Sequence, residues 1–417
     1  MAGQDLGSTS GRGFSWLIAG LLLFALFVNY IDRQTLSVLV RFLPAKLQMS
    51  DIQYGRIQWM FLFSYALSMP LAGWTVDRLG TRLGLAVTVA VWSVIEALHG
   101  TARSVNQLGF YRLMLGIPES AGLPSVSKAA AEHAAPHARA TLIGIAMFGL
   151  GMGSTFAPPV VSFLTRHFGW SWAFYGTGIA GILWMILWLI LYRPNPSQQT
   201  FEKPKPKTPW VSLLRDRTVM GLTLSRAFSD SIWWFYLFWI PPFLVKSRGL
   251  DLHQIGYLGW IPYFFASIGS IVGGYSSGYL VRRGWEPFRA RLAVMWVSAL
   301  VVPFTTFVVM ATSVAGVLAL LAVATFFIQA FFSNVFALPA DLFPREKVAS
   351  VVGLNTMAGS LAGSFAILAA GYVVERYSYV PAFVAMAFFL PMGVTCASLV
   401  LRSHARRILN AVPVTSS

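Results

Sequence analysis

The feature that most constrains this chain is a series of apolar stretches, each about as long as a helix that crosses a lipid bilayer. A spanning helix needs roughly 20 consecutive, mostly apolar residues. Twelve stretches of the chain meet this requirement, and they lie near residues 14–38, 57–76, 82–103, 108–130, 141–163, 172–192, 221–245, 255–281, 291–312, 314–339, 349–373 and 381–401. The sequence therefore predicts an all-α membrane protein with twelve transmembrane helices.

The composition fits a protein whose surface faces lipid. Only 11% of the residues are charged and 56% are hydrophobic, whereas a soluble domain carries about 25% charged residues. The net charge of +16 could suggest a nucleic-acid partner, but the basic residues lie in short clusters between apolar stretches, so we expect none. Residues 1–13 are polar and no cleavage site follows them, so no cleavable signal peptide is expected. The single cysteine, Cys396, excludes an internal disulfide.

The charge of the loops predicts the orientation of the chain. If both termini are cytoplasmic, the cytoplasmic loops and tails hold most of the 31 lysine and arginine residues. Only Arg33, Arg112 and Arg226 then fall inside the spans. This bias follows the positive-inside rule. We therefore expect a multi-pass protein of the inner (plasma) membrane with both termini in the cytoplasm, and we expect a monomer.

A polar segment divides the chain into two halves. Residues 193–217 contain five prolines and several basic residues, a composition typical of an extended, solvated linker. Six helices on either side of a basic linker is the layout of transporters built from two related halves. The predicted parts are a cytoplasmic tail (1–13), a six-helix half (14–192), a cytoplasmic linker (193–220), a second six-helix half (221–401) and a cytoplasmic tail (402–417).

The loop after the second stretch carries a recognisable motif. Its residues Gly73, Asp77, Arg78, Gly80 and Arg82 resemble the signature loop of the major facilitator superfamily. Asp77, an acid at a helix end, can pair with arginines and hold neighbouring helices in one state, so we interpret these five residues as a conformational latch. The alternative is a loop that merely follows positive-inside statistics. The loop after the eighth stretch repeats the spacing, but Gly278 stands in place of the acid.

Ionisable residues inside spans are costly and are functional candidates by default. Asp32 and Arg33 in the first span are adjacent, so they point about 100° apart on a helix and can serve different partners. The alternative is an interfacial pair that extends toward water.

The fourth span carries Arg112 and Glu119, which lie two helical turns apart on one face. Glu119 should lie near mid-membrane, where Pro118 and Pro124 loosen the helix around it. A carboxylate at that depth can bind and release a proton, as proton coupling requires. The alternative is a static bridge to Arg112 or Arg33.

Three further features of the spans need an interpretation. Arg226 and Asp230 in the seventh span are four residues apart, which favours a structural bridge. The aromatic run over residues 233–239 covers every face of a helix, so some rings must face inward. We select the hydroxyls of Tyr65 and Tyr236 as candidate pocket groups. Glu96 in the third span has no assigned role.

Four segments together resemble the anion:cation symporter family of the major facilitator superfamily. The sequence Asn29-Tyr-Ile-Asp-Arg-Gln-Thr-Leu-Ser37 is similar to its first-span motif, and Tyr111-Arg-Leu-Met-Leu-Gly-Ile-Pro-Glu119 to its fourth-span motif. Residues 233–241 and 338–344 look closest to hexuronate transporters. The resemblance covers about residues 14–401.

The resemblance implies proton-driven uptake of organic anions such as hexuronates and aldonates, with alternating access. Asp32 and Glu119 would be the proton-coupling acids, and Arg112 would hold the substrate carboxylate beside Arg33. The remaining substrate-binding residues that it implies, or that we add from the aromatic pattern, are Tyr30, Tyr65, Tyr236, Asn334, Asn355 and Ser360.

The chain departs from the family at two places. Gly122 stands where sugar-acid members usually have asparagine, and Met147-Phe148 stand where they have an asparagine–serine pair. Fewer hydroxyl partners suggest a less hydroxylated substrate, so an aromatic or short aliphatic carboxylate is a second possibility. An anion exchanger or uniporter would keep the arginines without needing Glu119.

A membrane enzyme or sensor is a further class. The sequence shows no nucleophile–base set, metal-ligand cluster or phosphate-binding loop, so we expect no catalysis, cofactor or metal. The expected partners are a small organic anion, protons and the lipid bilayer.

Overall fold

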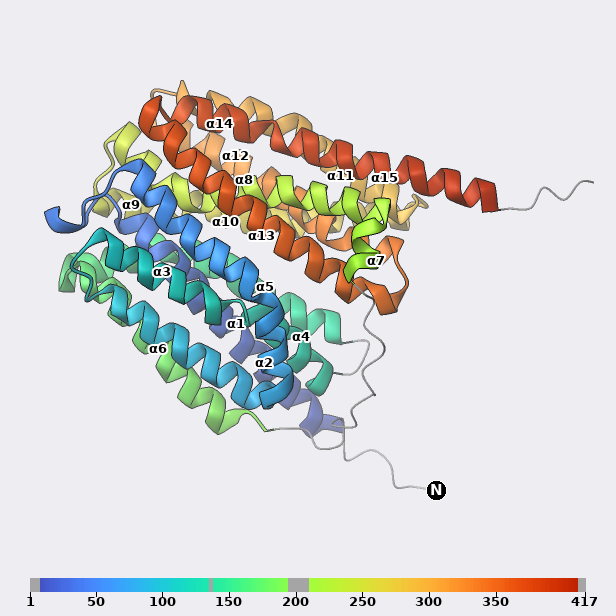
Figure 1. The fold of residues 1–417 in the computed structure, drawn as a ribbon, viewed down its shortest axis with the longest axis horizontal. Helices are drawn as coiled ribbons and strands as arrows, with labels where there is room; N and C mark the ends of the chain where they lie inside the picture. The colour runs from blue at the N-terminus through green and yellow to red at the C-terminus, as the bar shows by residue number, and fades with distance from the viewer. Residues whose placement is uncertain (1–7, 135–137, 194–209, 412–417) are drawn as a thin grey trace, which may run out of the picture. The chain divides into compact units, whose positions relative to one another are not determined.

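Helices make up most of the residues that the structure describes, which are 8–134, 138–193 and 210–411 of this computed structural model (Figure 1). Parts of the predicted tails and linker, residues 1–7, 194–209 and 412–417, lie outside this description. The helices are α1 (Ser8–Leu39), α2 (Asp51–His99), α3 (Val105–Glu119), α4 (Gly122–His133), α5 (Arg139–Phe168), α6 (Trp170–Leu191), α7 (Trp210–Arg215), α8 (Arg217–Arg248), α9 (Leu252–Leu258), α10 (Ile261–Arg282), α11 (Pro287–Val301), α12 (Val314–Leu342), α13 (Arg345–Arg376), α14 (Tyr379–Ala387) and α15 (Phe389–Ala411).

Nine helical segments among the described residues are long and apolar enough to cross a membrane. One of them, α2, has 49 residues and at 1.5 Å per residue is more than twice the thickness of a bilayer core. It therefore holds two of the predicted spans. The other two predicted spans, 108–130 and 221–245, fall on α3 with α4 and on α8. Both carry buried charged residues, which lower their hydropathy. The prediction of an all-α membrane fold with twelve spans is confirmed.

Gly80 separates the two spans of α2. Its φ of 75° and ψ of 163° are not helical, and this conformation is essentially restricted to glycine. Gly80 therefore has a backbone function, because the helix of one span ends and the helix of the next begins at this residue.

The described chain forms two compact units. Unit 1 comprises Met1–Pro204 together with Phe238–Trp260, and unit 2 comprises Lys205–Leu237 together with Ile261–Ser417. Helix α8 thus contributes its first part to unit 2 and its last part to unit 1. The predicted boundaries of the two halves, 14–192 and 221–401, stay a prediction.

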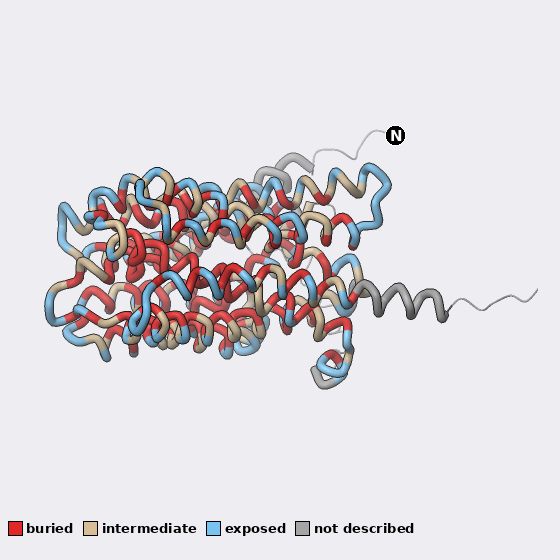
Figure 2. The backbone as a smooth tube through the Cα atoms, turned by 90° about the horizontal axis from the view of Figure 1, so that it is seen from above, coloured by how far each residue is buried: buried red, intermediate tan, exposed pale blue. Residues whose placement is uncertain are grey.

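Glycines let the helices of unit 1 approach closely. A Cβ atom on Gly116 of α3 would lie 2.2 Å from the Ser64 hydroxyl of α2, and one on Gly153 of α5 would lie 2.4 Å from the Phe27 carbonyl oxygen of α1. Larger residues would force these helices apart. The close packing brings α3 against α2 and α5 against α1. Figure 2 marks the buried residues along the backbone, and those of α1, α2 and α3 include polar side chains.

Candidate functional site

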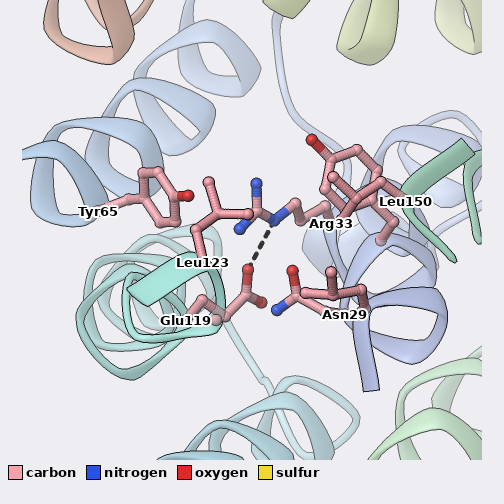
Figure 3. A pocket seen from close by; sticks show the side chains of 9 residues that line it. Asn29, Arg33, Tyr65, Glu119, Leu123 and Leu150 are labelled. Carbon is pink, nitrogen blue, oxygen red and sulfur yellow. Dashed lines mark hydrogen bonds and ion pairs between the residues drawn. The ribbon is translucent and has the colours of Figure 1, made fainter. Parts of the chain in front are cut away.

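A cavity lies within unit 1 (Figure 3). Its wall is built by helices α1 to α5, and the lining residues are Leu26, Asn29, Tyr30, Arg33, Tyr65, Glu119, Gly122, Leu123 and Leu150. One part of this wall is polar and charged, and another part is aliphatic. The cavity is small in this structure, with a volume of about 20 Å³, and its wall offers a positive charge, aromatic rings and aliphatic side chains.

Arg33 provides the positive charge of the cavity wall. Its guanidinium carbon lies 4.8 Å from the centre of the Tyr30 ring and 4.6 Å from the centre of the Tyr65 ring. Its Nε donates a hydrogen bond of 2.8 Å to Glu119 Oε2. Two cation–π contacts and one buried ion pair fix the plane of the guanidinium. The guanidinium of Arg33 is therefore held in a fixed orientation at the cavity wall.

Glu119 lies where the helix of the fourth span is interrupted. Helix α3 ends at Glu119 and α4 begins at Gly122, a break that agrees with the prolines at positions 118 and 124. Its Oε1 atom has no hydrogen-bond partner among the described residues, although Asn29 lies on the same side of the cavity (Figure 3). In this structure Glu119 is thus paired with Arg33, one of the alternatives that the sequence left open.

Arg112 and Asp32 lie in the buried interior of unit 1 and are not among the residues that line the cavity. Arg112 is fully buried, and its Nη2 donates to the backbone oxygen of Asp32 at 3.3 Å. Within the described part of the chain, Nε and Nη1 of Arg112 and both carboxylate oxygens of Asp32 have no hydrogen-bond partner. The structure therefore brings Arg33 and Glu119 to the cavity and leaves Arg112 with donors available in the core.

The candidates from the second half of the sequence belong to unit 2. Tyr236 is buried, with its ring 5.5 Å from the Phe383 ring. Asn334 donates to two backbone carbonyls, one from α10 and one from α12. Asn355 accepts a hydrogen bond of 2.7 Å from the Thr223 hydroxyl of α8. Ser360 is also buried. Their assignment as substrate-binding residues stays a prediction.

The structural bridge predicted in the seventh span is present. Arg226 Nε lies 2.7 Å from Asp230 Oδ1, and both side chains are buried. The guanidinium carbon lies 4.1 Å from the Phe332 ring centre and 3.6 Å from that of Phe336. The pair is therefore packed between α8 and α12 as a fixed element of unit 2.

The acid of the motif loop pairs with a lysine. Asp77 Oδ1 lies 3.4 Å from Lys128 Nζ of α4, and the same ammonium group donates to the Val76 carbonyl at 2.8 Å. We had expected arginine partners. Lys128 takes this position because α4 packs against the end of the second span, where its ammonium also satisfies a backbone carbonyl.

The two arginines of the motif contact helices α2 and α6. The guanidinium carbon of Arg78 lies 5.2 Å from the Trp74 ring centre. Arg82 donates to the Leu189 carbonyl at 2.6 Å, in the last turn of α6. Gly73 has open space around the position of a Cβ atom. The motif thus joins α2 to α4 and α6 at one end of unit 1.

A model of the Major Facilitator Superfamily matches residues 22–367 of the chain. The chain belongs to the major facilitator superfamily. It is therefore a multi-pass membrane protein, and the resemblance noted in the sequence is confirmed. A solved structure described as a bacterial homolog to the human lysosomal transporter Spinster shares this fold, with a TM-score of 0.73 at 18% identity over 97% of each chain.

Several curated relatives of this superfamily member are named as transporters of sugar acids. The hexuronate transporter of Escherichia coli K12 is 27% identical over 94% of this chain and 95% of its own length. The hexuronate transporter of Bacillus subtilis 168 is 27% identical over 85% and 87%. A Cupriavidus necator protein named a "probable sulfoacetate transporter" is 28% identical over 86% and 87%.

Sequence reasoning did not assign a role to Asn29, Leu123 or Leu150, which line the cavity. Asn29 lies four residues before Arg33, so the helical period places both side chains on one face of α1. That spacing was a usable signal. The sequence gave no such signal for Leu123 and Leu150, because it does not distinguish a leucine that faces a cavity from one that faces lipid.

Proposed function

We propose that the protein is a secondary active transporter that imports an organic anion, such as a hexuronate or aldonate, by proton symport with alternating access. The observation that carries this proposal is the pairing of Arg33 with Glu119 in a cavity wall that also holds Tyr30 and Tyr65. The names of the relatives support the sugar acid as substrate. The proposed setting is the inner membrane, with both termini in the cytoplasm and the protein as a monomer.

The pairing suggests how anion and proton are coupled. A substrate carboxylate that binds Arg33 competes with Glu119 for the same guanidinium. Once displaced, Glu119 would be an unpaired buried carboxylate, which is costly unless it takes up a proton. Binding of the anion and protonation of Glu119 therefore favour each other. Asp32 is the second proposed coupling acid, and Arg112 the second proposed anion-binding cation.

A test of this proposal uses the purified protein in liposomes whose lumen is either more acidic or more alkaline than the external buffer. We expect labelled galacturonate or galactonate to accumulate when the outside is more acidic, and the accumulation to disappear when a protonophore abolishes the gradient. Uptake that only equilibrates, whatever the gradient, would contradict symport and support the uniporter. Uptake that requires a counter-anion inside would support the exchanger.

A less hydroxylated carboxylate is a second candidate substrate. Leu26, Gly122, Leu123 and Leu150 make part of the cavity wall apolar, and apolar side chains cannot satisfy the hydroxyls of a sugar acid. Competition for uptake by a panel of unlabelled anions distinguishes the two. Galacturonate and galactonate should compete best if the substrate is a sugar acid, whereas benzoate, propionate or sulfoacetate should compete best if it is not.

A further inference from the structure

Helix α10 has one face that packs against a neighbouring helix and one face that is exposed. On the packed face, a Cβ atom on Gly269 would lie 2.1 Å from the Phe326 carbonyl oxygen, so α12 covers this side. The large apolar side chains of the exposed face are Phe264, Phe265, Ile271, Val272, Tyr275 and Tyr279. Because Leu252–Arg282 is apolar enough to cross a membrane, we interpret the exposed face as a surface for lipid.

Two arginines continue the exposed face at the C-terminal end of α10. Arg282 lies seven residues after Tyr275, which is about two helical turns. Arg283 lies four residues after Tyr279, so these two side chains are also neighbours on the helix surface. The two guanidinium carbons lie 5.3 Å and 5.2 Å from the centres of the respective tyrosine rings. Along the helix, the exposed face therefore changes from apolar side chains to tyrosine rings and then to positive charge.

Arg282 and Arg283 form no ion pair with an acid of the described residues, and both are exposed. Arg289 of α11 differs from them, because its Nε lies 3.0 Å from Glu286 Oε2. Arg283 donates to the Tyr279 hydroxyl from Nε at 2.9 Å and from Nη2 at 2.6 Å. This contact orients the guanidinium but leaves its charge uncompensated. The end of α10 thus presents two positive charges that no acid of the described chain neutralises.

The turn after α10 shows that the arginines are not needed to cap the helix. Gly284 has a φ of 89°, and its N–H donates to the Val281 carbonyl at 2.9 Å. The N–H of Trp285 donates to the Leu280 carbonyl at 3.1 Å. These are the two hydrogen bonds of a Schellman motif, which satisfies carbonyls at the end of a helix. Trp285 is also exposed, and tryptophan and tyrosine favour the headgroup level of a membrane.

The length of the exposed face agrees with the depth of one leaflet. Ile271 and Arg283 are 12 positions apart, which corresponds to about 18 Å along a helix. Half of the hydrocarbon core of a bilayer is about 15 Å thick. A phospholipid whose acyl chains lie along this face would therefore have its phosphate at the level of the two guanidiniums.

We propose that the C-terminal end of α10 is a binding site for an anionic phospholipid. Arg282 and Arg283 bind the phosphate of the headgroup through charge-assisted hydrogen bonds, and Ile271, Val272 and Tyr275 contact the acyl chains. A zwitterionic headgroup has a phosphate but also a cationic group, which two arginines repel. The site therefore prefers phosphatidylglycerol to phosphatidylcholine. This inference does not depend on the proposed transport activity.

The test uses native mass spectrometry of the full-length protein, purified in detergent and titrated with phosphatidylglycerol or phosphatidylcholine. The measured quantity is the affinity for the first lipid molecule bound, and we expect the wild-type protein to prefer phosphatidylglycerol. Arg282→Gln/Arg283→Gln should bind phosphatidylglycerol about 30-fold more weakly, since each arginine near a membrane surface contributes roughly a fivefold gain in affinity. Arg282→Lys/Arg283→Lys should retain most of the affinity, because both charges remain.

The matched control is Arg215→Gln/Arg217→Gln, which removes two exposed arginines from the same unit and should bind phosphatidylglycerol like the wild-type protein. Equal losses in the two glutamine variants would show that binding follows net charge alone and would overturn the site. Equal affinity of the wild-type protein for the two lipids would overturn it as well. All double variants should melt like the wild-type protein, because exposed substitutions have small effects on stability.

Inorganic phosphate distinguishes a lipid from a free anion. Because phosphate has no acyl chains, an excess of it over the lipid should not displace phosphatidylglycerol from the wild-type protein. Displacement would show that the two arginines bind a free phosphate group and would overturn the lipid as the occupant of the site.

Discussion

At the scale of single residues, the two arginines of the first half differ in their surroundings. Arg33 lines the cavity between two tyrosine rings and pairs with Glu119. Arg112 is buried away from the cavity wall and donates to a backbone carbonyl. The resemblance assigned the substrate carboxylate to Arg112, whereas Arg33 is the arginine that lines the cavity.

We expect Arg33→Ala to weaken substrate binding by at least about 100-fold, because it removes the charge and both charge-assisted hydrogen bonds to a carboxylate. Arg33→Lys should weaken binding by about tenfold, since lysine keeps the charge but lacks the planar fork that stacks between the rings. Equilibrium binding of labelled substrate to detergent-purified protein measures both. Arg56→Ala is the control, because Arg56 is an exposed arginine of α2. Unchanged binding in Arg33→Ala would remove this residue from the site.

At the scale of elements, the motif loop contains two glycines with different requirements. Gly80 has a φ of 75°, whereas Gly73 is helical, and a Cβ atom would meet no neighbour within 4 Å at either position. The sequence motif presents both glycines alike. Only the backbone geometry shows that one of them needs the absence of a side chain.

Gly80→Ala should therefore destabilise the protein by about 1–3 kcal/mol through backbone strain. Gly73→Ala should leave stability unchanged or slightly higher, because alanine favours a helix. The apparent melting temperature of each purified variant checks this pair. Equal losses in both variants would show that the motif glycines serve helix contact rather than the conformation at Gly80.

The ion pair of the motif loop provides a second prediction at this scale. The Asp77 side chain is 71% exposed, and an exposed pair contributes only about 0–1 kcal/mol to stability. We expect Asp77→Asn and Lys128→Gln to melt near the wild-type temperature and bind substrate normally, yet to transport slowly because the latch is weakened. Initial uptake rates and equilibrium binding separate these effects. Loss of binding with a normal transport rate would contradict the latch.

At the scale of the whole molecule, the sequence predicted the fold because each span is an apolar stretch that can be recognised from its own residues alone. It also indicated Asp32, Arg33, Arg112 and Glu119, because charge in a span is conspicuous. It could not predict that Glu119 pairs with Arg33 rather than Arg112, since side-chain partners depend on how α1 and α3 pack. The buried position of Glu96 was likewise undetermined until helix faces were known.

The coupling between anion and proton is a property of the whole molecule, and Glu119→Gln tests it. Glutamine can still accept a hydrogen bond from Arg33 but can neither carry a charge nor release a proton. If Glu119 is a coupling acid, the variant should exchange labelled for unlabelled substrate across the membrane yet fail to concentrate it on a pH gradient, because the proton no longer accompanies the anion. If the pair is only structural, removing one partner of a buried ion pair costs about 3–5 kcal/mol, and stability should fall together with every transport mode.

Asp230→Asn provides the matched control, because Arg226 and Asp230 form a buried pair in unit 2 to which we assign a structural role. A stable Glu119→Gln variant that accumulates substrate normally would show that Glu119 is not required for coupling and would leave Asp32 as the principal coupling acid.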